Sequence, residues 1–281
     1  MSGVEQLTQR INTEFEAGRI NLPLLPEIAL RVRKAVNNED TSIRDLAALI
    51  QTDASITARI IQISNSPLYK TASKATDCNS AISKLGMKTT RDIVTCLVIH
   101  NMFSSSHVLI RKKLEKIWKE SSYVAAISSV LAREIPNLQV DTALLAGLVH
   151  NIGKLPILNY IEEFPELVED EKQVDVLLES MHQDIGAKIL QKWGFDDVIQ
   201  QIPELTSNFK RESSGDADYS DVVIVAKIHS LFGSASATKL PVLTDIPAFK
   251  KLALSDEGAE ASLLVLQEAR QDIQLVLRSL R

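Results

Sequence analysis

The sequence has few of the residues that cross-link or interrupt a chain. It contains two cysteines, Cys78 and Cys96, in 281 residues, and they do not form a C-x-x-C pair. A disulfide framework is therefore excluded, and both residues are expected to be reduced thiols, as is usual in the cytoplasm. Glycine and proline are also scarce, with 10 and 9 residues, which argues against long loops and low-complexity segments.

Long apolar runs are missing as well. No stretch approaches the roughly eighteen consecutive apolar residues of a membrane-spanning helix, so none is expected. Residues 1–20 are polar and contain no apolar segment of signal-peptide length. These features predict a soluble protein that is located in the cytoplasm.

An excess of basic charge is lacking too. The formal net charge is −5, whereas a nucleic-acid-binding surface needs clustered Lys and Arg to neutralise phosphates. One local basic run is formed by Arg111, Lys112, Lys113, Lys116 and Lys119. A solvated helix face explains this run without any ligand, so nucleic acid is not expected as a partner.

Hydrophobic periodicity of the helical type is present along almost the whole chain. Ile43, Leu46 and Ile50, for example, fall on one face of a helix. The apolar stretch of residues 222–232 is compatible with a buried strand, but its length and the helical context favour a helix. No dinucleotide-binding glycine fingerprint, P-loop or Gly-x-Ser-x-Gly motif occurs. The sequence therefore predicts an all-α protein built as a multi-helix bundle.

Polar and glycine residues mark the expected helix ends and the division of the bundle. Asp53 and Asp141 are suited to cap helix N-termini, and Gly153 and Gly194 are suited to end helices. The polar run of residues 104–106 indicates a boundary. We expect an N-terminal helical subdomain over 1–105, a second helical subdomain over 106–235, and a connector with a final amphipathic helix, residues 260–281, over 236–281.

Short segments from about Ile20 to Phe232 carry a resemblance to a known family. They include Leu22-Pro23-Leu24-Leu25-Pro26, Ser64-Asn65-Ser66-Pro67-Leu68-Tyr69, Trp118-Lys119-Glu120-Ser121, His150-Asn151-Ile152-Gly153-Lys154 and Lys192-Trp193-Gly194-Phe195. In this order they resemble the HDOD family, the HD-related output domains of bacterial signalling proteins. The resemblance implies that residues 106–235 form an HD-like helical subdomain, related to the HD superfamily of metal-dependent phosphohydrolases.

The ligand set of the HD enzymes is not preserved in this chain. In that superfamily a separate His, a His-Asp pair and a distant Asp hold a divalent metal that activates water. The matching positions here are Glu120, His150, Asn151 and Lys227, so one His is retained. An amide oxygen is a poorer ligand than a carboxylate for a divalent cation, and an ammonium repels one. The resemblance therefore implies a vestigial HD site without a bound metal.

Single residues of this site have more than one interpretation. His150 is either a remaining metal ligand or a core histidine. Glu120 is either a new carboxylate ligand or the partner of Lys227 in an ion pair that fills the old cavity. Lys154 matches the family's Gly-Lys and suits a phosphate contact, or is a solvent-facing lysine at a helix end. His182 stands where HD relatives often carry a further histidine, and is either a ligand or an ordinary helix histidine.

The loss of metal ligands predicts a non-catalytic HDOD-type module of bacterial signal transduction without a cofactor. It would act by binding a signalling protein or a nucleotide second messenger in the groove between the subdomains. The alternative is a metal-dependent phosphohydrolase acting on a nucleotide or cyclic dinucleotide, with Glu120, His150 and His182 on the metal and Lys154 on phosphate. A third interpretation is a scaffold that forms a homodimer through its last helix. Resemblance of fold alone does not decide between them.

Overall fold

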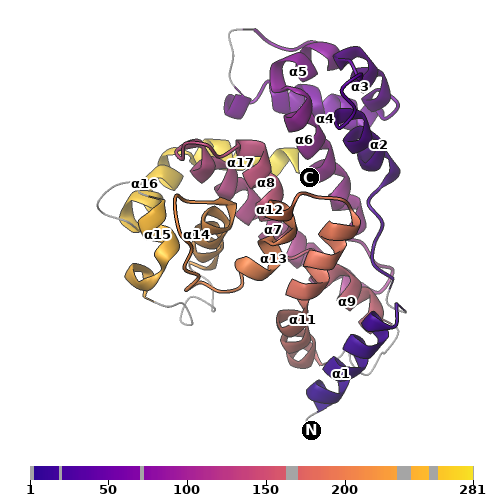
Figure 1. Ribbon diagram of the computed structural model, residues 1–281, viewed down its shortest axis with the longest axis vertical. Helices are drawn as coiled ribbons and strands as arrows, with labels where there is room; N and C mark the ends of the chain where they lie inside the picture. The colour runs from indigo at the N-terminus through magenta and orange to yellow at the C-terminus, as the bar shows by residue number, and fades with distance from the viewer. Residues whose placement is uncertain are drawn as a thin grey trace.

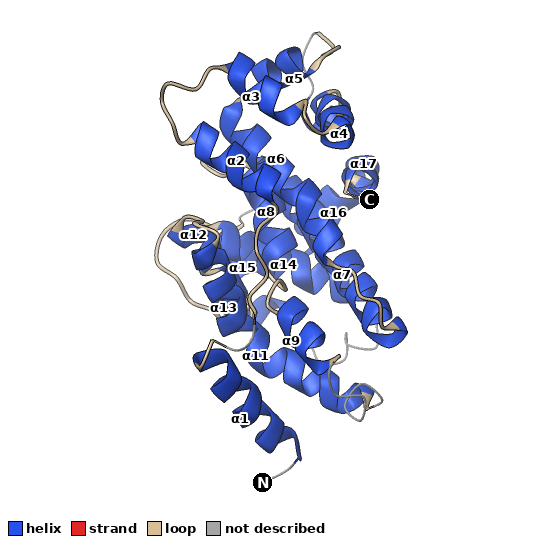
Figure 2. Ribbon diagram, turned by 90° about the vertical axis from the view of Figure 1, so that its right-hand side faces the viewer, coloured by secondary structure: helices blue, strands red, loops and turns tan. Residues whose placement is uncertain are grey.

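The computed structural model describes residues 3–18, 21–69, 73–162, 170–232, 242–252 and 259–280. Every regular element in these ranges is a helix (Figure 2), and none of the helices is both long and apolar enough to cross a membrane. The predicted all-α class is confirmed. The stretch that was compatible with a strand belongs to the helix α14 (Tyr219–Leu231).

One end of the molecule is built from five helices (Figure 1). They are α2 (Glu27–Val36), α3 (Ile43–Ile50), α4 (Ala54–Ser64), α5 (Cys78–Leu85) and α6 (Met87–Ile99). The short 3-10 helix η1 (Pro67–Tyr69) follows α4, and η2 (His100–Met102) follows α6. Asp53 caps α4 as predicted, because its side chain accepts hydrogen bonds from the N–H groups of Ser55 and Ile56.

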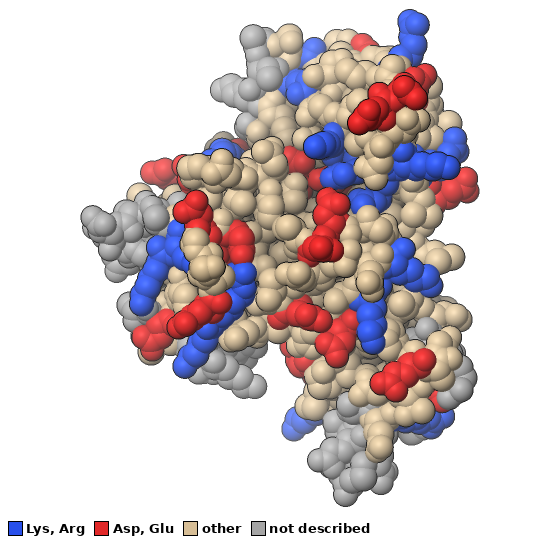
Figure 3. Space-filling view, in the orientation of Figure 1, with Lys and Arg blue, Asp and Glu red and all other residues tan. Residues whose placement is uncertain are grey.

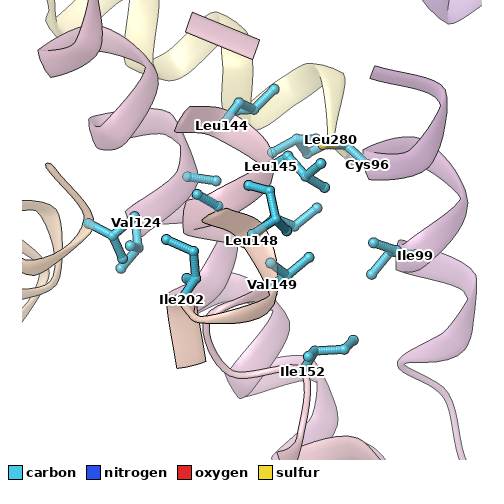
Figure 4. Packing of buried hydrophobic residues seen from close by; sticks show 14 of the residues in the cluster. Cys96, Ile99, Val124, Leu144, Leu145, Leu148, Val149, Ile152, Ile202 and Leu280 are labelled. Carbon is cyan, nitrogen blue, oxygen red and sulfur yellow. The ribbon is translucent and has the colours of Figure 1, made fainter. Parts of the chain in front are cut away.

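The centre of the molecule is a tightly packed pair of helices, α7 (Val108–Arg133) and α8 (Val140–Val149), with α14 against both. The two backbones of this pair approach closely at Gly147. A Cβ placed on Gly147 would lie 2.5 Å from the Cα of Ala125, so only glycine fits there. Buried side chains such as Val124, Leu145 and Leu148 fill the space around this crossing (Figure 4).

The remaining helices surround this central pair. They are α1 (Gly3–Glu16), α9 (Lys154–Ile161), α11 (Glu171–Lys192), α12 (Asp197–Gln200), α13 (Ile202–Leu205), α15 (Pro247–Lys251), α16 (Ala259–Glu268) and α17 (Arg270–Ser279), with the 3-10 helix η4 (Leu243–Asp245) before α15. The helix α1 lies against α11, at the end of the molecule opposite to α2–α5 (Figures 1 and 2). One continuous apolar core runs from Ile11 to Leu280.

Two sequence-based boundaries are corrected. The single final helix expected over residues 260–281 is two helices that meet at Ala269, because α16 packs on α7 whereas α17 reaches both α7 and α4. Asp141 does not cap α8: the helix begins at Val140 after Gln139, and Asp141 is buried inside the first turn. The subdomain boundary at residues 105 and 106 remains a prediction, and α6 packs directly on α8 across it.

Replacing Gly147 by alanine tests the close helix crossing. Alanine favours a helix over glycine by about 1 kcal/mol, but the added methyl group meets backbone atoms of α7 that cannot rotate away. Overpacking of this kind costs about 1–3 kcal/mol. We expect Gly147→Ala to lower the free energy of unfolding in urea, whereas Lys119→Ala, on the exposed face of α7, leaves it nearly unchanged. Equal or higher stability of Gly147→Ala would contradict the crossing.

Candidate functional site

His150 ends α8 and begins a tight turn that leads into α9. Its side chain is buried, and its Nδ1 lies 2.6 Å from the carbonyl oxygen of Gly147. A carbonyl oxygen only accepts, so Nδ1 carries the proton in this contact and donates it. Burial, followed by the nearby charges of Lys227 and Lys154, holds the pKa of His150 well below its ordinary value. His150 is therefore a neutral imidazole at neutral pH.

The turn after His150 is pressed against the backbone of α11. A Cβ on Gly153 would lie 2.0 Å from the carbonyl oxygen of His182 and 2.6 Å from the backbone nitrogen of Gly186. The backbone of Gly153 is right-handed helical, with φ −66°. The prediction that Gly153 ends a helix is wrong, because α8 ends at Val149 and Gly153 directly precedes α9. The glycine instead allows the two backbones to touch.

The helix α11 brings His182 and Glu179 to this turn. His182 is buried, and its Nδ1 has no hydrogen bond of good geometry among the described residues. Burial, followed by the charge of Lys154, lowers the pKa of His182 to about 4, although Glu179 and the carbonyl of Leu178 act in the opposite direction. A second neutral imidazole thus lies beside the first.

Lys154 begins α9 and points into the same place. It is 8% exposed, and its Nζ donates to Oε1 of Glu179 at 2.5 Å. The interpretation of Lys154 as a solvent-facing lysine is therefore wrong. Burial acts to raise the pKa of Glu179, but the Lys154 ammonium outweighs it, so the pKa is lowered and the carboxylate is charged. The Glu179 side chain itself is 67% exposed, so its carboxylate reaches Lys154 from the solvent side.

Lys227, on α14, is the fifth member of this group. Its Nζ donates to the carbonyl oxygen of Thr206 at 2.7 Å and lies 5.6 Å from the centre of the Phe209 ring. Burial, followed by the charge of Lys154, lowers the pKa of Lys227 to about 8, although Glu179 acts in the opposite direction. Lys227 therefore remains mostly protonated at neutral pH.

Glu120 does not belong to this group. It lies on the exposed face of α7, and its Oε1 is 4.0 Å from Nζ of Lys116, one turn earlier. The next residues, Ser121 and Ser122, are the ones that turn inward and are buried. The predicted ion pair between Glu120 and Lys227 is wrong, because the register of α7 points Glu120 to solvent.

We call the five residues His150, Lys154, Glu179, His182 and Lys227 the lysine–histidine cluster. Asn151 is buried in the adjoining turn, and its backbone carbonyl oxygen accepts a hydrogen bond from the backbone N–H of Lys154 at 3.0 Å. Sequence analysis missed Glu179. Its position three residues before His182 places both side chains on one face of α11, which is the signal that finds it.

The donor set of the cluster does not match a divalent metal site. Two lysines and one glutamate give a net charge of +1, and both imidazoles are neutral. Among the described residues, no three His, Cys, Asp or Glu side chains are arranged to hold a metal ion. Divalent metals in proteins are held by several such donors together. The cluster is suited instead to an anionic group that would replace or join Glu179.

Two lysines of the basic run of residues 111–119 lie near acidic side chains. Nζ of Lys113 lies 2.9 Å from Oδ1 of Asp175, and Lys116 is near Glu120. Basic and acidic side chains are also interspersed over the face of the molecule shown in Figure 3. Neither feature forms the continuous basic surface that nucleic acids require.

Comparison with known proteins agrees with this fold. The family model of the HDOD domain matches residues 22–208. A curated protein of Treponema pallidum (strain Nichols) is 22% identical over 198 residues, which are 65% of this chain and 37% of that protein. The chain thus spans little more than a third of the length of this relative.

Solved structures show the same architecture. A candidate metal-dependent phosphohydrolase of Shewanella amazonensis SB2B is 28% identical, with all of both chains covered and a TM-score of 0.85. An HDOD domain protein of unknown function from Geobacter sulfurreducens is 22% identical, with 98% of this chain and 97% of that chain covered and a TM-score of 0.67. A candidate signal transduction protein of Marinobacter aquaeolei VT8 is 19% identical, with 93% and 60% covered and a TM-score of 0.60.

The half-buried ammonium of Lys227 makes stability depend on pH in a defined window. Its pKa in the folded chain is about 8, below the ordinary value of 10.5 for a lysine, so the unfolded chain binds the extra proton between these pH values. Stability from this group therefore rises with pH in that window. Relative to Lys227→Met, we expect the wild-type free energy of unfolding to gain about 1.5 kcal/mol between pH 8 and pH 9.5.

Denaturant unfolding of the two proteins at each pH measures this difference, because other titrating groups are common to both. The exposed Lys119→Met variant is the control, and its difference from the wild type should not change with pH. A constant difference for Lys227→Met as well would show that the ammonium is not desolvated.

Proposed function

The chain belongs to the HDOD family, and we propose that it is a non-catalytic signalling module that acts by binding. The observation that carries this proposal is the lysine–histidine cluster. Two lysines, Lys154 and Lys227, stand beside His150 and His182, where the HD resemblance expects a metal with carboxylate ligands. The positive charge at this place is then supplied by the protein itself.

Electrostatics favours this arrangement over a bound metal. Two unit charges 4 Å apart interact by about 4 kcal/mol at an effective dielectric constant near 20, and a divalent ion doubles that value. A dication beside the histidines would meet repulsion of this order from each ammonium. Deprotonated Lys227 would escape the repulsion, but its pKa of about 8 keeps it largely charged at neutral pH.

The partner proposed for this site carries an anionic group. Glu179 fills that role within the chain, because its carboxylate approaches Lys154 from the solvent side. A phosphate of a nucleotide second messenger, or a carboxylate of a signalling protein, has the charge and the oxygen acceptors to compete with Glu179. Binding there would break or weaken the ion pair between Lys154 of α9 and Glu179 of α11. The contact between these two helices would then change when the partner binds.

A second candidate function is a metal-dependent phosphohydrolase. The observation that favours it is the similarity over the full chain to the Shewanella amazonensis structure with that description. In this case His150 and His182 would be the remaining nitrogen ligands, and Lys154 would contact phosphate. The proposal of a non-catalytic module and this alternative differ in one measurable property, which is hydrolysis.

An assay of phosphodiester hydrolysis separates the two functions. We expect the wild-type protein, supplied with manganese and bis(para-nitrophenyl) phosphate, to release nitrophenol no faster than buffer with manganese. His150→Ala should then give the same rate as the wild type, since no catalytic site exists to be lost.

The matched control is His100→Ala, which removes a histidine that packs on Trp118 outside the cluster. Metal-dependent hydrolysis by the wild type that persists in His100→Ala and disappears in His150→Ala would contradict the proposal. That pattern would assign the phosphohydrolase function instead.

A further inference from the structure

The C-terminal end of α11 is held by the N-terminal part of the chain. The indole N–H of Trp193 donates to the backbone carbonyl oxygen of Pro23 at 2.9 Å. On α2, Nη2 of Arg33 donates to the backbone carbonyl oxygen of Gly194 at 2.7 Å. The central carbon of the same guanidinium lies 3.9 Å from the centre of the Phe195 ring. Two hydrogen bonds and one cation–π contact therefore join the end of α11 to α2 and the segment before it.

The shape of the turn after α11 makes these contacts possible. Gly194 has a φ of 70°, which is the left-handed conformation that glycine adopts readily. The N–H of Gly194 donates to the carbonyl oxygen of Gln191 at 2.9 Å, and the N–H of Phe195 donates to that of Leu190 at 3.1 Å. Helices commonly end in this way. The prediction that Gly194 ends a helix is thus confirmed, and the turn directs the Phe195 ring into the core.

The guanidinium of Arg33 is buried at this contact. The residue is 6% exposed, and its Nη1 has no hydrogen-bond partner among the described residues. Burial, followed by the positive charge of Arg91, lowers the pKa of Arg33, although Asp92 and Asp196 act in the opposite direction. A buried charge with an unpaired donor is costly, so the contact offers little net stability. Its main effect is to fix where the end of α11 lies relative to α2.

The same helix carries two residues of the lysine–histidine cluster. His182 and Glu179 lie 11 and 14 residues before Trp193, which corresponds to about 16 and 21 Å along the axis of α11. The helix contains no proline. Its one glycine, Gly186, faces the turn of the cluster, since a Cβ on it would lie 3.4 Å from the backbone nitrogen of Gly153. An unbroken helix moves as one element, so a displacement of its C-terminal end reaches the cluster.

We propose that α11 couples the position of the N-terminal helices α2–α6 to the geometry of the lysine–histidine cluster, with Arg33 as the positioning residue at the junction. Withdrawal of its guanidinium releases the end of α11, and the helix then shifts Glu179 and His182 relative to Lys154. A small shift of one packed helix is a common form of conformational switch. The coupling concerns how the cluster is built, so it does not depend on whether the cluster binds an anion or a metal.

Nuclear magnetic resonance of ¹⁵N-labelled protein tests the coupling. At pH 7 the imidazole signals of His182 report its position and not its charge, because a pKa of about 4 keeps it neutral. We expect Arg33→Met to shift these signals, whereas Arg31→Met, on the exposed face of the same helix, leaves them in place. The signals of His229, which contacts Ser262 outside the cluster, should stay in place in both variants. No shift at His182, or equal shifts at both histidines, would overturn the proposal.

The reverse experiment displaces α11 at the cluster and observes its C-terminal end, because coupling is reciprocal. Alanine is a better helix former than glycine, but Gly186→Ala places a methyl group 2.9 Å from a side-chain carbon of Pro203. We expect this variant to shift the indole N–H signal of Trp193, about two helical turns away. The control is Asp184→Ala, on the exposed face of α11, which should not shift it. If Arg33→Met does not fold, this comparison decides, and an unchanged Trp193 signal in Gly186→Ala would refute the coupling.

Discussion

Two lysines, Lys154 and Lys227, lie at the junction of α8, α9, α11 and α14, close enough for the charge of one to lower the pKa of the other. The neighbouring polar groups compensate or respond to these two positive charges. Glu179 pairs with one of them, and a backbone carbonyl of Thr206 accepts from the other. Burial and these charges together keep the neighbouring histidines neutral. An uncompensated buried charge is costly, so each of these contacts constrains where the four helices can lie.

The junction is held by close contacts between backbones. Gly147 lets α8 touch α7, and Gly153 lets the following turn touch α11. Between these two contacts lies His150, whose Nδ1 is fixed by the carbonyl of Gly147 itself. The same short segment therefore determines the packing of the central helices and the position of the cluster. A residue larger than glycine at either contact would displace the central helices and the cluster together. Stability of the fold and geometry of the site therefore depend on the same two glycines.

Much of the fold was predictable from sequence, because periodicity and capping are local. The all-α class, the Asp53 cap and the helical nature of residues 222–231 followed from neighbouring residues. The errors concern contacts between distant segments. Glu120 turns outward because the register of α7 is set by packing on α8. The final helix breaks at Ala269, and α17 then reaches α4 as well as α7. The role of Glu179 was not predicted from the sequence, because it consists of an ion pair with Lys154, which lies 25 residues away in the chain.

The HDOD fold thus carries, in this chain, a centre whose positive charge comes from lysines. The most direct test is the metal content of protein purified without chelators, measured by elemental mass spectrometry beside the Asn151→Asp, Lys227→Asp double variant. We expect far less than one equivalent of manganese, iron or zinc in the wild type. We expect higher metal content in the double variant, which regains two carboxylates and loses one ammonium. One equivalent of metal in the wild type would contradict a centre whose positive charge comes from lysines.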